Sequence, residues 1–281
     1  MYNYHTHTQF CDGSAEPELY IFSAIEQGMK VLGFSAHAPV SFENTWSLKT
    51  GDISNYCKRI QELKKQYCDK IIILNGLEID YIPDITTSFA EFIKNCNLDF
   101  TVGSVHLVKS ILSNELWFID GPEKNYTTGL SNIFNNEIET AVGAYFKQIQ
   151  EMVFTQHPDI IGHVDKIKMN NKKRFFNEDE KWYIRLVDDT LKVIAQHNCI
   201  VELNTRGVYT GKSDTFFPST FILEKCFMLK IPIMINSDAH KPEQLTLKYK
   251  EAVGLLKDIG FEKLFILDRT GRKAVEINEY L

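Results

Sequence analysis

Two histidines near the start of the chain have the spacing of a metal site. His5 and His7 are two residues apart, and side chains at this spacing on an extended strand point to the same side. Asp12 follows after a short turn and offers a carboxylate oxygen nearby. The alternative is a pair of ordinary histidines in a polar segment, because short metal motifs also occur by chance. Ligands elsewhere in the chain decide between these interpretations.

Further candidate ligands stand where apolar runs end. Of seven predicted strands, six end at a His, Asp or Glu, and the sixth strand ends at Asn204 instead. Taken singly, each of these residues could be a core or turn side chain with an ordinary hydrogen-bond partner. Their shared position at strand ends favours one common site. The complete set of candidate ligands is His5, His7, Asp12, His37, Glu78, His106, His163, Asp238 and His240.

Short apolar runs alternate with amphipathic segments along the chain. The predicted strands comprise residues 2–6, 31–35, 71–78, 99–105, 160–162, 199–203 and 231–235. The predicted helices comprise residues 16–28, 52–68, 85–95, 137–155, 179–197, 219–229 and 243–258. This alternation favours parallel pairing, and closing the series gives an α/β barrel. Such barrels carry their active sites at the carboxyl ends of the strands, where the candidate ligands are expected.

Two segments do not follow the alternation. Residues 109–136 show little periodicity, and at this length we expect a functional loop or lid, with Trp117, Phe118 and Asp120 in it. Residues 166–178 form a basic loop. The tail after the last predicted helix is expected to be peripheral.

Composition narrows the class of protein. Of 281 residues, 44% are hydrophobic and 24% are charged, which is typical of a globular protein with a large core. The net charge of -6 argues against a nucleic-acid or anionic-membrane partner, because both need a basic face. Six cysteines without a CxxC pair favour reduced thiols. With no signal peptide and no long apolar run, we expect a cytoplasmic protein.

The donor types indicate which metals the site would prefer. Nine nitrogen and oxygen donors without a thiolate suit zinc, manganese or iron. Nine ligands are too many for one ion, so we expect two or three divalent ions with a carboxylate bridging between them.

Six short motifs together resemble the PHP (polymerase and histidinol phosphatase) superfamily over essentially the whole chain. Besides the histidine pair, they are Ser35-Ala36-His37-Ala38-Pro39, Gly76-Leu77-Glu78, Gly103-Ser104-Val105-His106, Gly162-His163-Val164-Asp165 and Asn236-Ser237-Asp238-Ala239-His240. The resemblance implies one domain over residues 1–281, with a distorted (β/α)7 barrel and a trinuclear metal site. Glu78, Asp238 and His240 would then be catalytic as well as ligands.

Position by position, the resemblance also implies how the ligands are shared. The three sets are His5, His7, Glu78 and Asp238; then Glu78, as a bridge, with His106 and His163; and then Asp12, His37 and His240.

Within the superfamily, the chain is most similar to the stand-alone histidinol-phosphatases of histidine biosynthesis. The motifs behind this are Glu202-Leu203-Asn204-Thr205-Arg206-Gly207, followed by Phe217-Pro218-Ser219, and Leu116-Trp117-Phe118-Ile119-Asp120-Gly121. The branch implies hydrolysis of L-histidinol phosphate to L-histidinol and phosphate. Alternatives are a phosphoesterase acting on a phosphotyrosine protein or a nucleotide, or a metal-binding protein without catalysis.

Five residues are expected to contact the substrate. We expect Arg206 or Arg174 to bind the phosphate, since the guanidinium group can pair with two oxygens at once. Trp117 and Phe118 would cover the imidazole ring, unless Trp117 anchors its own loop, and Asp120 would pair with the ammonium group. The expected partner is thus a small phosphate monoester, and the oligomeric state stays open, a homodimer included.

Overall fold

Seven parallel strands form the frame of the protein, whose computed structural model describes residues 1–111 and 113–281. The strands pair in chain order, which confirms the predicted alternation. They are β1 (Tyr2–Asn3), β2 (Val31–His37), β3 (Ile72–Asp80), β4 (Phe100–Ser104), β7 (Ile160–Ile161), β8 (Ile200–Asn204) and β9 (Ile233–Asn236). The sheet curls into a nearly closed barrel, so the distorted (β/α)7 fold is confirmed.

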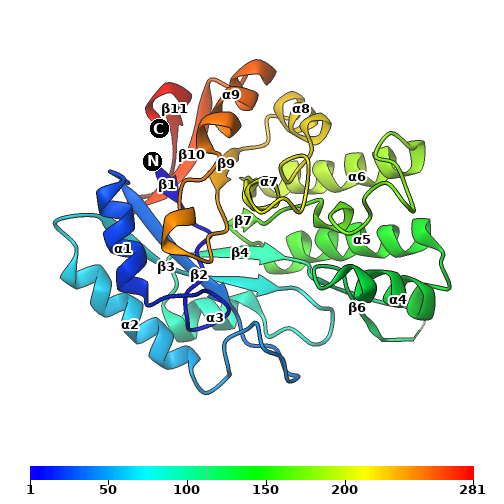
Figure 1. Ribbon diagram of the computed structural model, residues 1–281, viewed down its shortest axis with the longest axis horizontal. Helices are drawn as coiled ribbons and strands as arrows, with labels where there is room; N and C mark the ends of the chain where they lie inside the picture. Colours follow the sequence, from blue (N-terminus) through cyan, green and yellow to red (C-terminus); the bar gives the residue numbers. More distant parts are fainter. Residues whose placement is uncertain (112) are drawn as a thin grey trace.

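Helices surround this sheet and connect its strands (Figure 1). The seven that correspond to predicted helices are α1 (Pro17–Glu26), α2 (Ile53–Gln66), α3 (Phe89–Cys96), α5 (Ile138–Gln156), α6 (Lys181–His197), α8 (Thr220–Met228) and α9 (Tyr249–Ile259). Helix α3 begins four residues later than predicted, because the Ser88 side chain accepts a hydrogen bond from Glu91 N and caps it there.

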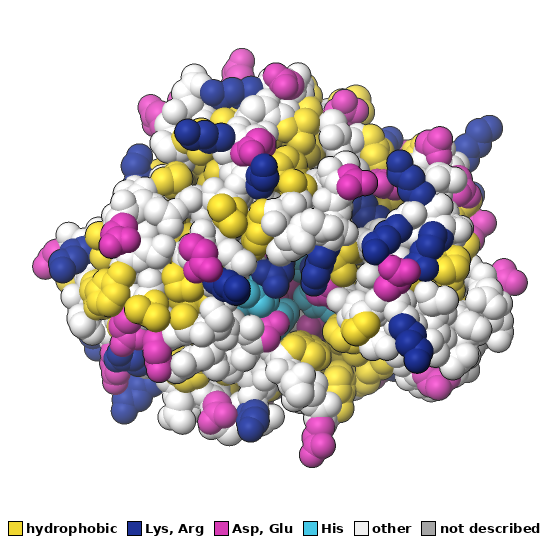
Figure 2. All heavy atoms as spheres, viewed as in Figure 1, with side chains coloured by type: hydrophobic (Ala, Val, Ile, Leu, Met, Phe, Trp, Pro, Cys, Tyr) yellow, Lys and Arg dark blue, Asp and Glu magenta, His cyan; other side chains and the backbone are white. Residues whose placement is uncertain are grey.

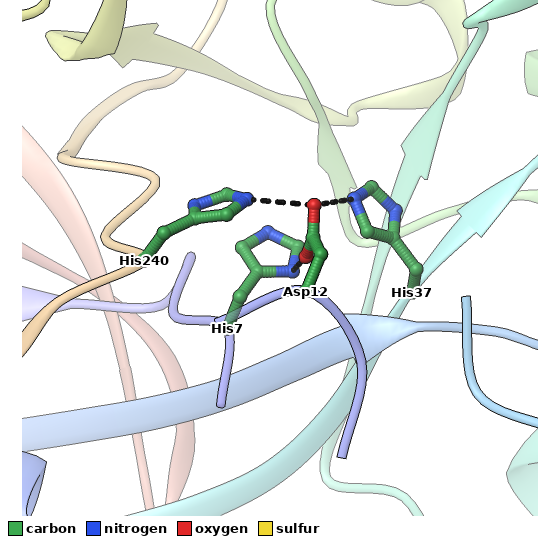
Figure 3. Close-up of side chains that lie close together, drawn as sticks. All are labelled: His7, Asp12, His37 and His240. Atoms are coloured by element: carbon green, nitrogen blue, oxygen red, sulfur yellow. Dashed lines mark hydrogen bonds and ion pairs between the residues drawn. The ribbon is translucent and has the colours of Figure 1, made fainter. Parts of the chain in front are cut away.

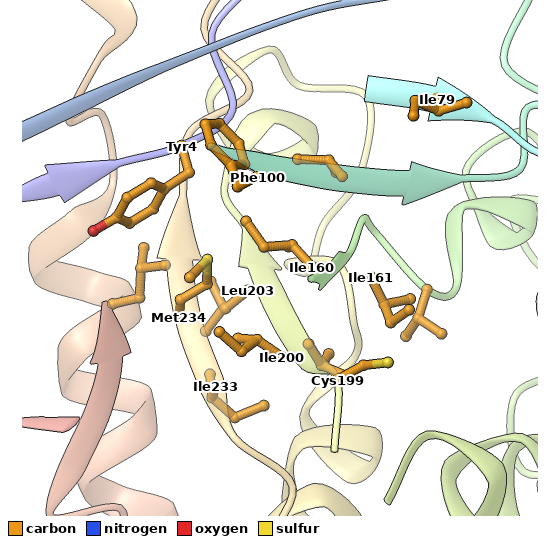
Figure 4. Close-up of a cluster of buried hydrophobic side chains, with 14 of the residues drawn as sticks. Tyr4, Ile79, Phe100, Ile160, Ile161, Cys199, Ile200, Leu203, Ile233 and Met234 are labelled. Atoms are coloured by element: carbon orange, nitrogen blue, oxygen red, sulfur yellow. The ribbon is translucent and has the colours of Figure 1, made fainter. Parts of the chain in front are cut away.

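The interior of the barrel is filled by aromatic and branched side chains from facing strands. Figure 4 shows Tyr4, Phe100, Leu203 and Met234 among them, and all four are buried. The Phe100 ring lies so close to Gly76 that a Cβ there would come within 2.4 Å of it. Strands buried on both faces read as continuous apolar runs, which is why they were recognisable in the sequence.

Residues 109–136 differ from the loop that was expected. They contain most of a short hairpin, β5 (Leu107–Lys109) with β6 (Leu116–Phe118), followed by helix α4 (Glu123–Phe134). Tyr126, Leu130 and Phe134 recur every four residues and are the buried face of α4. The expectation of little periodicity was therefore wrong for residues 123–134. Only three apolar residues repeat at the helical spacing, and the polar residues between them obscured this repeat in the sequence. Leu112 lies outside the described residues.

The tail after α9 packs closely against the barrel, although a peripheral position was expected. It forms an antiparallel hairpin, β10 (Lys263–Asp268) with β11 (Gly271–Glu276). The Tyr4 hydroxyl, inside the first strand connection, donates to Leu267 O at 2.7 Å and accepts from Leu267 N at 2.9 Å. The rings of Tyr2 and Tyr280 lie 5.2 Å apart, which brings the two chain ends together (Figure 1).

Three 3-10 turns and one very short helix complete the regular structure of the described residues. They are η1 (Lys166–Lys168), α7 (Arg206–Tyr209), η2 (Pro242–Gln244) and η3 (Ile277–Glu279). Among the described helices, none combines the length and the apolar character that crossing a membrane requires.

The Tyr4 contacts predict how strongly the tail stabilises the barrel. Tyr4→Phe removes one hydroxyl and leaves Leu267 N and O buried without that partner. We expect the free energy of unfolding to fall by about 1–3 kcal/mol, measured by urea denaturation with an unchanged slope. A loss below about 0.5 kcal/mol would mean that packing alone holds the tail in place.

Candidate metal centre and substrate pocket

The closure of the barrel brings the two ends of the chain together at the candidate site. Beyond β1 and β9 the chain continues in parallel, so that Ala239 N donates to His5 O at 3.0 Å and His7 N donates to Ala239 O at 2.8 Å. This pairing places His5 and His7 beside Asp238 and His240. The first and last motifs of the sequence thus form one surface at the carboxyl end of the barrel.

Glu78, at the carboxyl end of β3, is the centre of the cluster. One carboxylate oxygen lies 3.1 Å from His5 Nε2 and 3.1 Å from His37 Nδ1. The other oxygen lies 3.0 Å from His163 Nε2. The nearest ring nitrogens of His7 and His106 lie 3.4 Å and 3.8 Å away. Five imidazoles therefore surround one carboxylate that is almost fully buried.

Asp12 organises a second, more exposed part of the cluster (Figure 3). Its Oδ2 lies 3.2 Å from His240 Nε2 and 3.9 Å from His37 Nε2, and its Oδ1 lies 3.6 Å from His7 Nδ1. Asp238 connects the two parts, since its Oδ1 is 3.4 Å from both His7 Nε2 and His240 Nδ1. The structure brings all nine predicted residues together at one mouth of the barrel.

The donor atoms of this cluster fit divalent metal ions. His5 Nε2, His7 Nε2 and His37 Nδ1 are buried and lie 3.1–3.4 Å from Glu78 oxygens, but none of the three makes a contact with hydrogen-bond geometry among the described residues. Buried polar atoms are normally paired, so orphans that converge on carboxylates point to a missing cation. The groups whose donor atoms lie within 4.8 Å of one another are His7, Asp12, His37 and His240; His5, His7 and Asp238; His5, Glu78 and His163; and His37, Asp80 and His106.

Charge and burial hold several of these groups in the form that binds metal. Burial by itself would raise the pKa of Glu78, but His5 and His37 hold this pKa well below its usual range. Burial, together with His240 and His37 nearby, lowers the pKa of His7 to about 3. Glu78 is therefore a carboxylate and His7 a neutral imidazole at pH 7, and both have lone pairs to offer.

Two buried carboxylates that we did not predict as site residues orient the histidines. Glu202 Oε2, on β8, accepts from His5 Nδ1 at 2.9 Å, and Asp80 Oδ1, on β3, pairs with His106 Nδ1 at 2.8 Å. Such contacts fix the ring and its tautomer, so that the other nitrogen faces the site. Their spacing in the sequence could have identified them, because residues two apart on a strand face the same side. Asp80 is two residues beyond Glu78 on β3, and Glu202 is two residues before Asn204 on β8.

A pocket of about 630 Å³ opens above the cluster. In Figure 2 the histidines lie at the floor of a hollow, with lysine and arginine side chains along one side. The residues that line the pocket are Asp12, His37, Trp46, Glu78, His106, Phe118, Asp120, Lys166, Arg206, Lys212, Asp238 and His240.

Three of the five predicted substrate contacts line this pocket, and two do not. Arg206, Asp120 and Phe118 line it. Trp117 is fully buried beside Tyr126 and donates its indole N–H to Tyr126 O at 2.9 Å, so its expected role was wrong and the alternative of a loop anchor is correct. Because alternate residues of a strand face opposite sides, Phe118 faces the pocket, as expected, while Trp117 faces away from it.

Arg174 is also absent from the pocket lining. Its guanidinium pairs with Glu123 Oε1 at 2.8 Å and donates to Asn170 O at 2.7 Å, so the expected phosphate contact was wrong for Arg174. Two lysines line the pocket instead: Lys166, from the basic loop predicted at 166–178, and Lys212, which was not predicted. Their positions depend on loop conformation, which residue spacing does not encode.

The polar side of the pocket carries an ion pair of its own. Lys166 Nζ lies 3.4 Å from Asp120 Oδ2. Burial would lower the pKa of Lys166, but Asp120 and Asp238 outweigh it and raise this pKa, so the ammonium stays charged. Burial would likewise raise the pKa of Asp120, but Lys166 and His106 bring it below the ordinary value. Both charges are therefore present at neutral pH.

An aromatic pair faces the charged side. The rings of Trp46, from the loop after β2, and Phe118, from β6, are inclined by only 23° with centroids 6.4 Å apart. Two nearly parallel rings at the mouth of a pocket favour a flat, unsaturated group of the ligand.

Known proteins resemble this chain in both sequence and fold. A probable histidinol-phosphatase of Schizosaccharomyces pombe is 28% identical over 94% of this chain and 89% of its own length. The crystal structure of a protein assigned as a histidinol phosphatase from Listeria monocytogenes superposes with a TM-score of 0.76 at 21% identity, covering 89% of this chain and 99% of that one.

A second solved structure has a bound ligand. It is the histidinol phosphate phosphatase of Lactococcus lactis in complex with zinc, L-histidinol and phosphate, with a TM-score of 0.67 and 21% identity over 97% of this chain and 98% of that one. The family model of the PHP domain matches residues 3–206, which include seven of the nine clustered residues. The chain therefore belongs to the PHP domain family.

Proposed function

We propose that this protein is a metal-dependent phosphomonoesterase that hydrolyses L-histidinol phosphate to L-histidinol and phosphate. The observation that carries the proposal is the pocket itself, in which a floor of metal-type donors faces three cationic side chains and one aromatic pair. The S. pombe relative, aligned over nearly the whole length of both chains, supports this substrate. Histidine biosynthesis in the cytoplasm is the context that we propose for the reaction.

Two or three divalent ions, zinc, manganese or iron, would occupy the floor of the pocket. Such ions would supply positive charge for the phosphoryl oxygens and would make a water molecule acidic enough to attack phosphorus near neutral pH. Glu78 is suited to bridge two of the positions, because its two oxygens face different histidines. Asp238 can serve either of the two parts of the cluster that it connects.

The cationic side of the pocket would hold the phosphate. Arg206 Nη1 donates to Asp238 O at 2.9 Å and to the Tyr209 hydroxyl at 3.4 Å, and these bonds fix the guanidinium over the floor. Its Nε and Nη2 make no hydrogen bond among the described residues and can donate to the phosphate. Lys166 and Lys212 add charge from neighbouring loops. Preorganised cations of this kind stabilise the charge that develops on the phosphoryl oxygens in the transition state.

The opposite side would select the organic part of the substrate. Trp46 and Phe118 would cover the imidazole ring of histidinol phosphate, and the Asp120 carboxylate would pair with its ammonium group. Trp46 comes from the loop after β2, Phe118 from β6, and Asp120 from the loop that follows β6. We therefore keep the proposal that the segment 109–136 determines the substrate, with Phe118, but not Trp117, covering the ring.

The first prediction from this proposal concerns the metals. Prolonged chelation should abolish hydrolysis, and zinc, manganese or iron should restore it. Glu78→Gln should lose more than one ion per chain by elemental analysis, because an amide is a neutral and poorer bridge, whereas Glu262→Gln, an exposed control, should keep them. Full activity in a preparation shown to be free of metal would refute the mechanism.

A second prediction concerns the phosphate. Arg206→Ala should keep its metal content but lose about 10²–10³-fold in kcat/KM, with weaker inhibition by inorganic phosphate. Arg206→Lys should recover only part of the activity, because a point charge replaces a planar fork. Arg185→Ala, which removes an exposed guanidinium elsewhere, is the control. Unchanged phosphate inhibition in Arg206→Ala would move the phosphate contact to the two lysines.

A third prediction tests the substrate itself. Histidinol phosphate should be hydrolysed with a higher kcat/KM than a nucleotide monophosphate or a phosphotyrosine peptide. Trp46→Ala should raise the KM for histidinol phosphate up to about tenfold and leave an acyclic alkyl phosphate unaffected, since only the ring contact is lost. Trp182→Ala, the same change on α6 outside the pocket, should leave both values alone. Preference for the nucleotide or the peptide would replace the proposed substrate.

A further inference from the structure

Asp120 is a pocket residue that no strand or helix holds in place. It lies between β6 and α4, outside any strand or helix, yet its carboxylate lines the pocket. A loop residue can recognise a ligand only if neighbouring groups fix it to within a fraction of an ångström. The ion pair with Lys166, at 3.4 Å, is too long to do this alone.

Asn170 supplies the missing restraint from the neighbouring loop. Its side-chain amide donates to Ile119 O at 2.8 Å and to Gly121 O at 2.9 Å, the two carbonyl groups on either side of Asp120. The Asn170 side chain is buried, with 7% of the residue exposed, so water competes little for these bonds. Ile119 N in turn donates to His106 O at 2.9 Å. The backbone around Asp120 is therefore tied both to Asn170 and to the strand end that bears His106.

Arg174 holds Asn170 in place and connects the same two segments a second time. Its Nη2 donates to Asn170 O at 2.7 Å, and its Nη1 pairs with Glu123 Oε1 at 2.8 Å, at the first residue of α4. Lys172 Nζ reaches the other Glu123 oxygen at 2.8 Å. The loop 166–174 and the segment 119–123 thus form one clasp, with Asn170 in its buried part and Glu123 in its exposed part.

We propose that Asn170 is a positioning residue for substrate recognition, because it holds the Asp120 carboxylate where the substrate's ammonium group binds. The inference rests on the proposed function for the amine-bearing substrate. Asn170 contacts neither the metal ligands nor the phosphate side of the pocket through its side chain. Its loss should therefore weaken recognition of the amine and leave the chemistry of phosphate release intact.

Two variants isolate the two donated hydrogen bonds. Asn170→Ala removes the side chain, and Asn170→Asp keeps its shape but removes both donors. Each should raise the KM for histidinol phosphate about tenfold, the cost of one displaced charge-assisted hydrogen bond, with kcat little changed. The KM for an aryl phosphate without an amine should stay constant. Lys173→Ala, on the same loop but exposed, is the matched control and should change neither value.

A double-mutant cycle shows whether Asn170 acts through Asp120. Asp120→Asn alone should also raise the KM for the amine-bearing substrate, and adding Asn170→Ala to it should have no further effect. Additive losses, or equal losses on the two substrates, would overturn the proposal and indicate a general structural role. Amide hydrogen exchange of the peptide 116–123 should rise in Asn170→Ala but not in Lys173→Ala, and unchanged exchange would also overturn it.

The wild-type protein separates a failure of this inference from a failure of the proposed function. If it does not hydrolyse histidinol phosphate, the proposed function fails, and the cycle is run with an aminoalkyl phosphate against the matching alkyl phosphate. Loss of selectivity in Asn170→Ala on that pair supports the positioning role, and unchanged selectivity overturns it. If histidinol phosphate is hydrolysed and Asn170→Ala keeps the wild-type KM, only the inference fails.

Discussion

A buried carboxylate surrounded by imidazoles is the constraint on which the rest of this structure depends. Glu78 is almost fully buried, with five histidines around it, and four ring nitrogens of the clustered histidines make no hydrogen bond among the described residues. Such a group of polar atoms is costly to bury unless cations or further hydrogen bonds compensate it. The barrel provides part of this compensation through Glu202 and Asp80, and the proposed metal ions would provide the remainder.

Closure of the barrel is what makes that cluster possible. His5 and His7 belong to the first strand connection, and Asp238 and His240 follow the last core strand. Backbone pairing around Ala239 brings these two ends of the chain together at the site. The hydrogen bond from the Tyr4 hydroxyl to Leu267 O in the tail hairpin stabilises the same closure of the barrel. The contacts that close the barrel are consequently the same contacts that assemble the metal cluster.

The substrate side of the pocket is built by a different principle. Trp46, Phe118, Asp120, Lys166 and Lys212 come from loops or from a short hairpin outside the barrel sheet. Loop residues lack the ladder of hydrogen bonds that fixes a strand end, so side chains of neighbouring loops must hold them. The clasp between the loop 166–174 and the segment 119–123 does this for Asp120. This division lets a fixed barrel carry the chemistry while its loops determine which phosphate ester fits.

The sequence by itself determined the barrel and the nine clustered residues, because both follow from local periodicity. Strands buried on both faces read as apolar runs, and polar residues directly after them must meet at one mouth of a parallel barrel. The same reasoning failed for Trp117 and Arg174. Which face of β6 meets the pocket, and which loop cation reaches it, depends on packing between segments distant in sequence. Only the tertiary structure decided that Trp46 and Lys212 line the pocket, that Trp117 does not, and that Arg174 pairs with Glu123.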